Sequence, residues 1–227
     1  MPPSHGIFLD VTWRMHPQLA GWVSEAICEG RPRAEGSLAR QSLILGGKVH
    51  PALASFGLRF VPVEPAGRSR RAPEEVEVVA DIWRNLQDLR WRDRHGVERS
   101  IGVDDVLVVA PYNVQVNELG EALPEGARVG TVDKFRGQEA PAVLVSMATS
   151  SGDDLPRDVD FLFSRNRLKV AVSRARYLSL VVASPRLLEV NCGSVDDLRL
   201  VNTLCHAWEW LERERLSGIG RDRAVGI

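Results

Sequence analysis

Three short apolar runs, at residues 106–110, 142–147 and 178–183, constrain the fold of this chain most strongly. A strand with one solvated face alternates apolar and polar residues, whereas these runs are almost entirely apolar. Such runs are typical of strands buried on both faces of a parallel sheet. Helical periodicity marks the segments 16–29, 73–89, 114–123, 164–176 and 195–215. Strands that alternate with helices predict an α/β fold with a parallel, doubly wound sheet.

The rest of the chain carries weaker signals. Two further strands are expected at 58–63 and 128–132. Glycine, proline, arginine and serine dominate residues 30–57, which we interpret as loop, and the charged segment 91–104 as a surface loop or short hairpin. We therefore expect one domain over residues 1–216 and a flexible tail over 217–227.

Composition excludes several classes of protein. The net charge is -1, whereas a pure nucleic-acid-binding module is usually basic, so any such site must be a local patch. Three cysteines without a Cys-x-x-Cys pair argue against a disulfide framework and a structural zinc site, and the five histidines lack ligand spacing, so no metal site is expected. No apolar run is long enough for a membrane span and no signal peptide is evident, which predicts a cytoplasmic protein without a membrane partner.

Four polar clusters adjoin the predicted strands and helices. They cover Asp10–Pro17, Val106–Gln115, Val129–Glu139 and Phe161–Arg176. Ligands of open α/β sheets bind outside the carboxyl ends of the strands, so we expect these clusters to gather at that edge. The arginine-rich fourth cluster, taken alone, fits a phosphate site or a solvated helix face equally well.

In their order and spacing, the four clusters resemble the second motor domain of superfamily 1 helicases. The resemblance is to the Upf-like branch, which contains the nonsense-mediated-decay RNA helicase and bacterial DNA/RNA helicases. That family carries Tyr-Arg-Met-His-Pro, a Pro-Tyr turn, Thr-Val-Asp-x-Phe-Gln-Gly-x-Glu and Asn-Val-Ala-x-Ser/Thr-Arg-Ala-Arg. The resemblance extends from about Ile7 to Leu188 and implies a C-terminal RecA-like domain of the P-loop NTPase type.

The resemblance implies a set of nucleotide-binding residues. Arg14 and Arg174 match arginines that reach the γ-phosphate, where positive charge stabilises phosphoryl transfer; ordinary ion pairs are the alternative. Trp13 replaces the tyrosine that stacks on adenine, although it could instead be a core or interface residue. Glu139 matches a carboxylate that binds the ribose hydroxyls. Gly137 would allow close approach of the backbone to the nucleotide, or serve only as a turn glycine.

A second set of residues matches positions that grip the backbone of a single strand. Such contacts hold nucleic acid without reading its sequence. The positions are Pro111, Tyr112, Asn113, Thr131, Val132, Lys134 and Lys169. For the Pro-Tyr-Asn turn, plain turn chemistry is an equal alternative. Lys169 replaces the usual asparagine and Arg136 the usual glutamine, with consequences that the sequence leaves open.

The sequence contains no Gly-x-x-x-x-Gly-Lys-Ser/Thr loop that would cradle phosphates and place a metal. The resemblance therefore implies half of a motor, with ATP bound between this domain and an N-terminal RecA-like domain that holds Mg²⁺. Single-stranded DNA or RNA is the expected partner, with 5′-to-3′ movement implied by the resemblance alone. Two alternatives remain: a non-catalytic single-strand-binding or regulatory module, and a Rossmann-type enzyme, although no Gly-x-Gly-x-x-Gly follows a strand.

Overall fold

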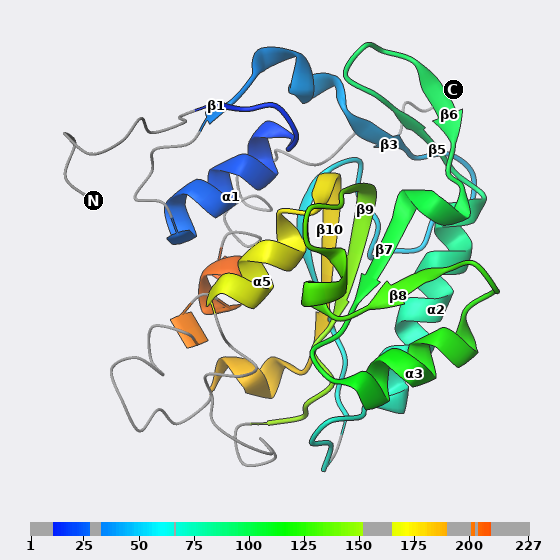
Figure 1. Cartoon of the computed structure of the whole chain (residues 1–227), viewed down its shortest axis with the longest axis vertical. Helices are drawn as coiled ribbons and strands as arrows, with labels where there is room; N and C mark the ends of the chain where they lie inside the picture. The colour runs from blue at the N-terminus through cyan, green and yellow to red at the C-terminus, as the bar shows by residue number, and fades with distance from the viewer. Residues whose placement is uncertain are drawn as a thin grey trace.

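A five-stranded parallel sheet forms the centre of the computed structural model (Figure 1). The structure describes residues 11–27, 33–65, 67–151, 165–189, 201–202 and 204–209. The strand order is β4-β10-β9-β7-β8, and every neighbouring pair is parallel. The predicted parallel α/β fold is confirmed. The strands span Gly57–Pro62 (β4), Val106–Val109 (β7), Arg128–Gly130 (β8), Ala140–Ser146 (β9) and Ala175–Ala183 (β10).

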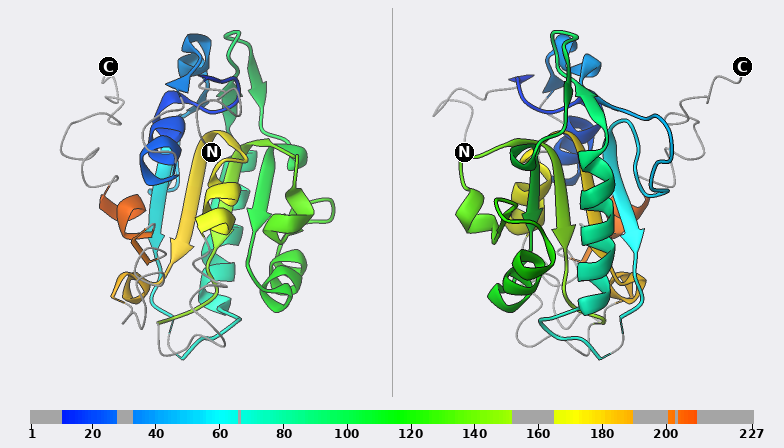
Figure 2. Two further views of the ribbon diagram at one scale, coloured as in Figure 1. Left: turned by 60° about the vertical axis from the view of Figure 1, so that its left-hand side comes forward. Right: turned by 90° about the vertical axis from the view of Figure 1, so that its right-hand side faces the viewer.

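Helices cover both faces of this sheet (Figure 2). Helices α1 (Pro17–Ile27) and α5 (Arg165–Val172) lie on one face, and α2 (Pro73–Gln87) and α3 (Asn113–Ala122) on the other. Along β7, Leu107 and Val109 pack toward the α1–α5 layer, whereas Val106 and Val108 pack toward the α2–α3 layer. Burial on both faces explains why the strands are continuous apolar runs rather than alternating ones.

The helix at the arginine-rich segment is shorter than predicted. Helix α5 ends at Val172, because Ala175 already pairs with Ala140 as the first residue of β10. Arg174 therefore lies in the turn between α5 and β10 and not within a helix that continues to Arg176. The other main helices agree with the predicted ranges within a few residues, as in α2, which begins at Pro73 and carries Glu74 and Glu75 in its first turn.

A second, small sheet was only partly predicted. Strand β3 (Ser42–Ile44) pairs antiparallel with β5 (Arg90–Arg92), which forms a hairpin with β6 (Glu98–Ser100). The hairpin agrees with one reading of segment 91–104. The prediction of loop throughout 30–57 was wrong, because this stretch also contains β2 (Arg33–Ala34), which pairs with β1 (Val11–Thr12), and the short helix η2 (Gly36–Arg40). Elements of two to five residues carry too little periodicity to be recognised.

Some predictions fall outside the described residues: the tail 217–227, the side chain of Lys169, two of the cysteines, and most of the helix expected at 195–215. Residues 201–202 and 204–209 of that segment are helical and pack against the α1 layer. In the described part of the chain, no helix is long and apolar enough to cross a membrane. No group of three or more metal-binding side chains occurs there either.

A buried polar network joins α2, α3 and the carboxyl end of β9. Glu75, Gln115 and Ser146 are each 0% exposed. The Ser146 hydroxyl donates to Glu75 Oε2 over 2.6 Å, and Gln115 Nε2 donates to the same hydroxyl over 2.9 Å. The Gln115 amide also bonds both backbone groups of Ala72 at the start of α2. The network fixes the start of α3 against the sheet, next to the predicted single-strand turn.

Glu75→Gln should change how stability depends on pH. Burial raises the pKa of Glu75 from about 4.5 to about 7, although bonds from Ser146 and Ala148 partly oppose that rise. Because the folded state binds this proton more tightly, the stability that it adds is complete below about pH 4.5 and is lost as the pH rises to about 7. The lost contribution is about 3 kcal/mol at about 1.4 kcal/mol per pKa unit. Urea unfolding from pH 4.5 to 8 should therefore show wild type losing stability relative to Glu75→Gln.

Glu74→Gln is the matched control, one residue earlier on α2. The hydrogen bond from Arg68 lowers the pKa of Glu74, so the sign of its pH dependence is opposite. Parallel stability profiles for wild type and Glu75→Gln would contradict a protonated, buried Glu75.

Candidate nucleotide and nucleic-acid sites

The predicted site residues fall into two groups at opposite edges of the sheet. Pro111 and Thr131 follow the carboxyl ends of β7 and β8. Glu139 instead precedes β9, whose first residue pairs with Ala175 at the start of β10. The expectation that all four clusters gather at the carboxyl edge was therefore wrong. The prediction failed because residues 131–139 cross from the carboxyl edge of the parallel sheet back to its amino edge before β9 begins.

Two arginines hold Glu139 at the amino edge. Arg14 Nε lies 2.5 Å from Glu139 Oε2, and Arg176 Nε and Nη2 lie 3.0 and 2.9 Å from Oε1. Partial burial would raise the pKa of Glu139, but the hydrogen bond from Arg14 and the positive charges of Arg176 and Arg14 lower it below its usual value. Glu139 is therefore an ionised acceptor at neutral pH.

The segment around Arg14 is fixed by backbone contacts. The His16 N–H donates to the Arg176 carbonyl over 2.6 Å, which joins the start of α1 to the start of β10. Gln41 Nε2 donates to the Arg14 carbonyl over 2.9 Å. His16 is buried and stacks on Phe56, and burial lowers its pKa to about 4 despite a backbone hydrogen bond that opposes the change. His16 is therefore neutral near pH 7 and acts as a packing residue.

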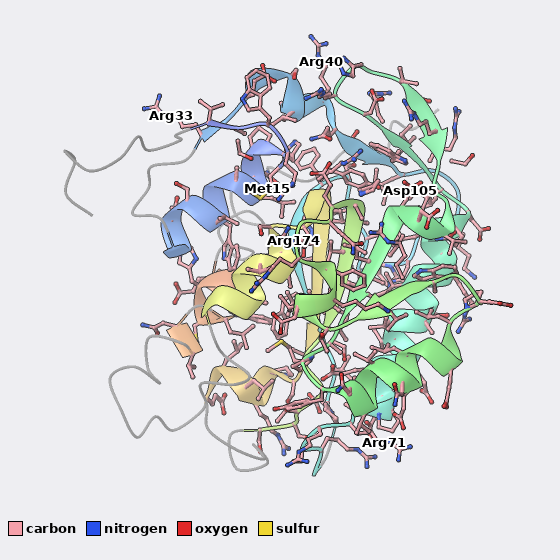
Figure 3. The ribbon with its side chains drawn as sticks, viewed as in Figure 1. Met15, Arg33, Arg40, Arg71, Asp105 and Arg174 are labelled. Atoms are coloured by element: carbon pink, nitrogen blue, oxygen red, sulfur yellow. The ribbon has the colours of Figure 1, made fainter. Side chains whose placement is uncertain are left out.

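Arg174 lies beside the same cluster but is held differently (Figure 3). Its Nε donates to the Val170 carbonyl and its Nη1 to the Gln138 carbonyl, each over 3.2 Å. No carboxylate of the described residues forms an ion pair with it. Burial, and then the nearby charge of Arg14, lower the pKa of Arg174. A guanidinium that is held by carbonyls beside a like charge is well suited to receive an anion.

The alternative readings of Arg14 and Trp13 can now be compared with the structure. Arg14 does form an ion pair, and its partner is Glu139, which was itself predicted to bind the ribose of the nucleotide. Trp13 is 65% exposed, so it is not a core residue. Both line a cavity of about 240 Å³ together with Glu139 and Arg176. An exposed indole, guanidinium groups and a carboxylate around one cavity fit the base, phosphates and ribose of a nucleotide.

Gly137 has a backbone reason to be glycine. Its φ is +81°, in the left-handed region, and a Cβ added there would meet no described atom within 4 Å. The turn conformation is therefore sufficient to require glycine. Close approach to a nucleotide stays a prediction.

At the carboxyl edge, the predicted single-strand residues lie on two neighbouring strand ends. Pro111 and Val132 line a small apolar cavity against α5. Asn113 and Lys134 are exposed, and Tyr112 packs partly against the core. Lys134 Nζ donates to the Val129 carbonyl over 2.8 Å. The hydroxyl of Thr131 does not cap the short helix η4 (Val132–Phe135) that it precedes.

Sequence reasoning gave no role to three parts of the amino-edge site. Arg176 binds Glu139 from β10; its place in the same arginine-rich cluster, two residues after Arg174, was the available signal. Gln41 lies in the segment predicted as loop. The β5–β6 hairpin lines the cavity with residues of its turn, and its arginine-rich run at 90–94, which we interpreted as surface loop, was the available signal.

A protein family and several known proteins match this chain. A family model described as "AAA domain" matches residues 3–186, most of the chain. The chain belongs to the AAA domain family. This AAA domain is 31% identical over 196 residues to the DNA-binding protein SMUBP-2 of Mesocricetus auratus, which covers 78% of the chain and 18% of that protein. It is 29% identical over 101 residues to the human RNA helicase Mov10l1, which covers 41% of the chain and 8% of that protein.

The AAA domain thus spans less than a fifth of the length of these relatives. A solved structure of the C-terminal domain of a "possible DNA helicase" from Lactobacillus plantarum overlaps it loosely, with a TM-score of 0.42 at 15% identity over 79% of this chain and 94% of that one. The motif order and the family match identify the chain as a C-terminal RecA-like domain of the superfamily 1 helicase type.

Proposed function

We propose that this AAA domain supplies the γ-phosphate arginines and part of the single-strand grip of an ATP-dependent DNA or RNA helicase. One observation carries the proposal: Arg14, Arg174 and Glu139 converge at one sheet edge from segments far apart in the sequence. A second motor domain with a phosphate loop would hold the Mg²⁺ and complete the site.

At the amino edge, this chain's residues bind and orient the nucleotide. Trp13 offers a face for the adenine, and the ionised Glu139 accepts hydrogen bonds from the ribose hydroxyls. Arg14 donates to Glu139 and to the Ser173 carbonyl, and phosphate oxygens accept charge-assisted hydrogen bonds from the same donors. Arg174 would donate to the γ-phosphate. ATP supplies the anhydride bond whose cleavage develops the charge that these arginines stabilise.

The two edges are joined by one short segment. Residues 131–139 begin with the predicted single-strand residue Thr131 and end with the ribose residue Glu139. Between them, η4 lies against α5, and Phe135 is buried in the core of that layer. Arg174 Nη1 donates to the Gln138 carbonyl of this segment. A change at the nucleotide would therefore move the single-strand grip through packed, hydrogen-bonded residues.

The second candidate function is a non-catalytic single-strand-binding module, which the absence of a phosphate loop from these 227 residues favours. Both candidates use the same carboxyl-edge grip. They differ in ATP turnover, which the module would never support even when a phosphate-loop domain is added.

Lys134→Ala should weaken single-strand binding in a salt-dependent manner. Each phosphate contact contributes about 0.7 to the slope of log affinity against log salt for single strands, so the slope should fall by about that amount. Fluorescence anisotropy with an oligonucleotide at several salt concentrations measures it. Lys48→Ala is the control, because Lys48 is also exposed but lies beside α2 near Asn85, away from this edge. An unchanged slope for Lys134→Ala would remove Lys134 from the grip.

A further inference from the structure

Two separate parts of the chain line the cavity at the predicted nucleotide-binding residues. Trp13, Arg14 and Glu139 come from the helicase-type motifs, whereas Arg94 and His95 come from the turn of the β5–β6 hairpin. None of the motifs includes this hairpin. The hairpin belongs to the small sheet of Figure 1, and its turn residues line the same cavity as the motif residues.

The hairpin turn is held firmly in place. Trp91 is buried at the base of the hairpin and stacks on Tyr177 of β10, with ring centroids 5.8 Å apart. In the turn, Asp93 Oδ1 accepts the backbone N–H groups of His95 and Val97 over 2.8 and 3.0 Å. Arg99 Nη2 donates to the other carboxylate oxygen of Asp93 over 3.2 Å. The turn side chains are thus presented on a rigid support.

The charges around the cavity favour an anionic ligand. Four guanidinium groups and two carboxylates line it. Both carboxylates already accept from protein groups, Asp93 within its turn and Glu139 from two arginines. Arg94 is different, because its Nε donates to His95 Nε2 over 3.1 Å while its terminal nitrogens bond to no described residue. Among the described residues, Arg94 is the one guanidinium of the cavity that donates to no carboxylate.

We infer that the hairpin closes the base–ribose end of the nucleotide site, with Arg94 as a contact for the adenosine moiety of a bound adenine nucleotide. The inference rests on the proposed function. The end is assigned because Trp13 and Glu139, the predicted adenine and ribose residues, line the cavity with Arg94. Of the two predicted γ-phosphate arginines, Arg14 lines it as a donor to Glu139, whereas Arg174 does not. A guanidinium plane stacks on a base or donates to its edge and to the ribose.

Arg94→Ala in this chain, combined with a motor domain that carries the phosphate loop, should weaken the binding of ADP about tenfold and leave the binding of inorganic pyrophosphate unchanged, with both measured as inhibitors of ATP turnover by the pair. Stacking by a cation on a base supports a loss of this size. Arg90→Ala is the matched control, since Arg90 lies on the same strand pair and is exposed but does not line the cavity. It should behave as wild type.

The outcomes separate this inference from the proposed function. If wild type binds ADP and Arg94→Ala binds it equally well, the hairpin contact is overturned and the proposed function stands. If Arg94→Ala weakens pyrophosphate as much as ADP, the contact is to phosphate and the assignment to the base–ribose end is overturned. If wild type combined with the phosphate-loop domain neither binds ADP nor hydrolyses ATP, the hairpin contact and the proposed function are both overturned.

Discussion

Arg174→Ala should reduce ATP turnover by the intact helicase at least a thousandfold, while the affinity for single strands changes by less than about threefold. An arginine that stabilises the transferring phosphoryl group is worth about 10³ to 10⁵ in kcat. Single-strand binding survives because, within the described part of the chain, Arg174 donates to the Val170 and Gln138 carbonyls near the amino edge, whereas the proposed grip lies at the carboxyl edge. Steady-state ATP hydrolysis at saturating ATP measures the first quantity and fluorescence anisotropy the second.

Arg84→Ala is the control for this variant. Arg84 is exposed on α2 and its ion pair with Asp81 is a surface contact, so its removal should leave both quantities within error of wild type. If both variants hydrolyse ATP at near-normal rates, Arg174 has no role at the γ-phosphate.

Glu139→Ala should abolish discrimination between ATP and 2′,3′-dideoxy-ATP. Because 2′,3′-dideoxy-ATP lacks both ribose hydroxyls, it offers the ionised Glu139 of wild type no hydrogen-bond donors there. Its KM in wild type should therefore be about 10- to 100-fold higher than the KM for ATP, as expected for the loss of hydrogen bonds to a charged group. In Glu139→Ala, KM for ATP should already be raised by a similar factor, and the two nucleotides should have equal KM values. Initial rates over a range of each nucleotide measure this comparison.

Glu98→Ala provides a matched comparison for Glu139→Ala. Glu98 also pairs with two arginines, Arg92 and Arg90, but it lies on β6 and does not line the cavity. Its loss should leave the preference for ATP intact. If Glu139→Ala keeps that preference as well, the carboxylate does not bind the ribose.

How far the sequence predicts this molecule depends on the length of its elements. Strands β7, β9 and β10 are almost entirely apolar runs because other elements pack on both of their faces, and helix α2 has apolar residues at helical spacing along its buried face. Strands β3, β5 and β6 are three residues each, and their buried side chains are Leu43 and Trp91. One buried residue in such a short strand shows no alternation of apolar and polar residues from which the strand could be predicted.

The residues of the candidate site were likewise predicted only in part. Arg14, Glu139 and Arg174 were found because motif spacing specifies them, and the structure brings them together. The edge at which they meet was mispredicted, since the rule for carboxyl ends of strands says nothing about a connection that returns to the amino edge. Arg94 escaped prediction because its place depends on Trp91 packing against Tyr177, a contact between residues far apart in the sequence.

The most direct test of the account is ATP turnover by this chain together with a motor domain that carries the phosphate loop, with and without single-stranded DNA or RNA. The account predicts no turnover by either part alone, single-strand-stimulated turnover by the pair, and none when the chain carries Arg174→Ala. Turnover by this chain alone, or equal turnover by the pair with and without Arg174, would contradict it.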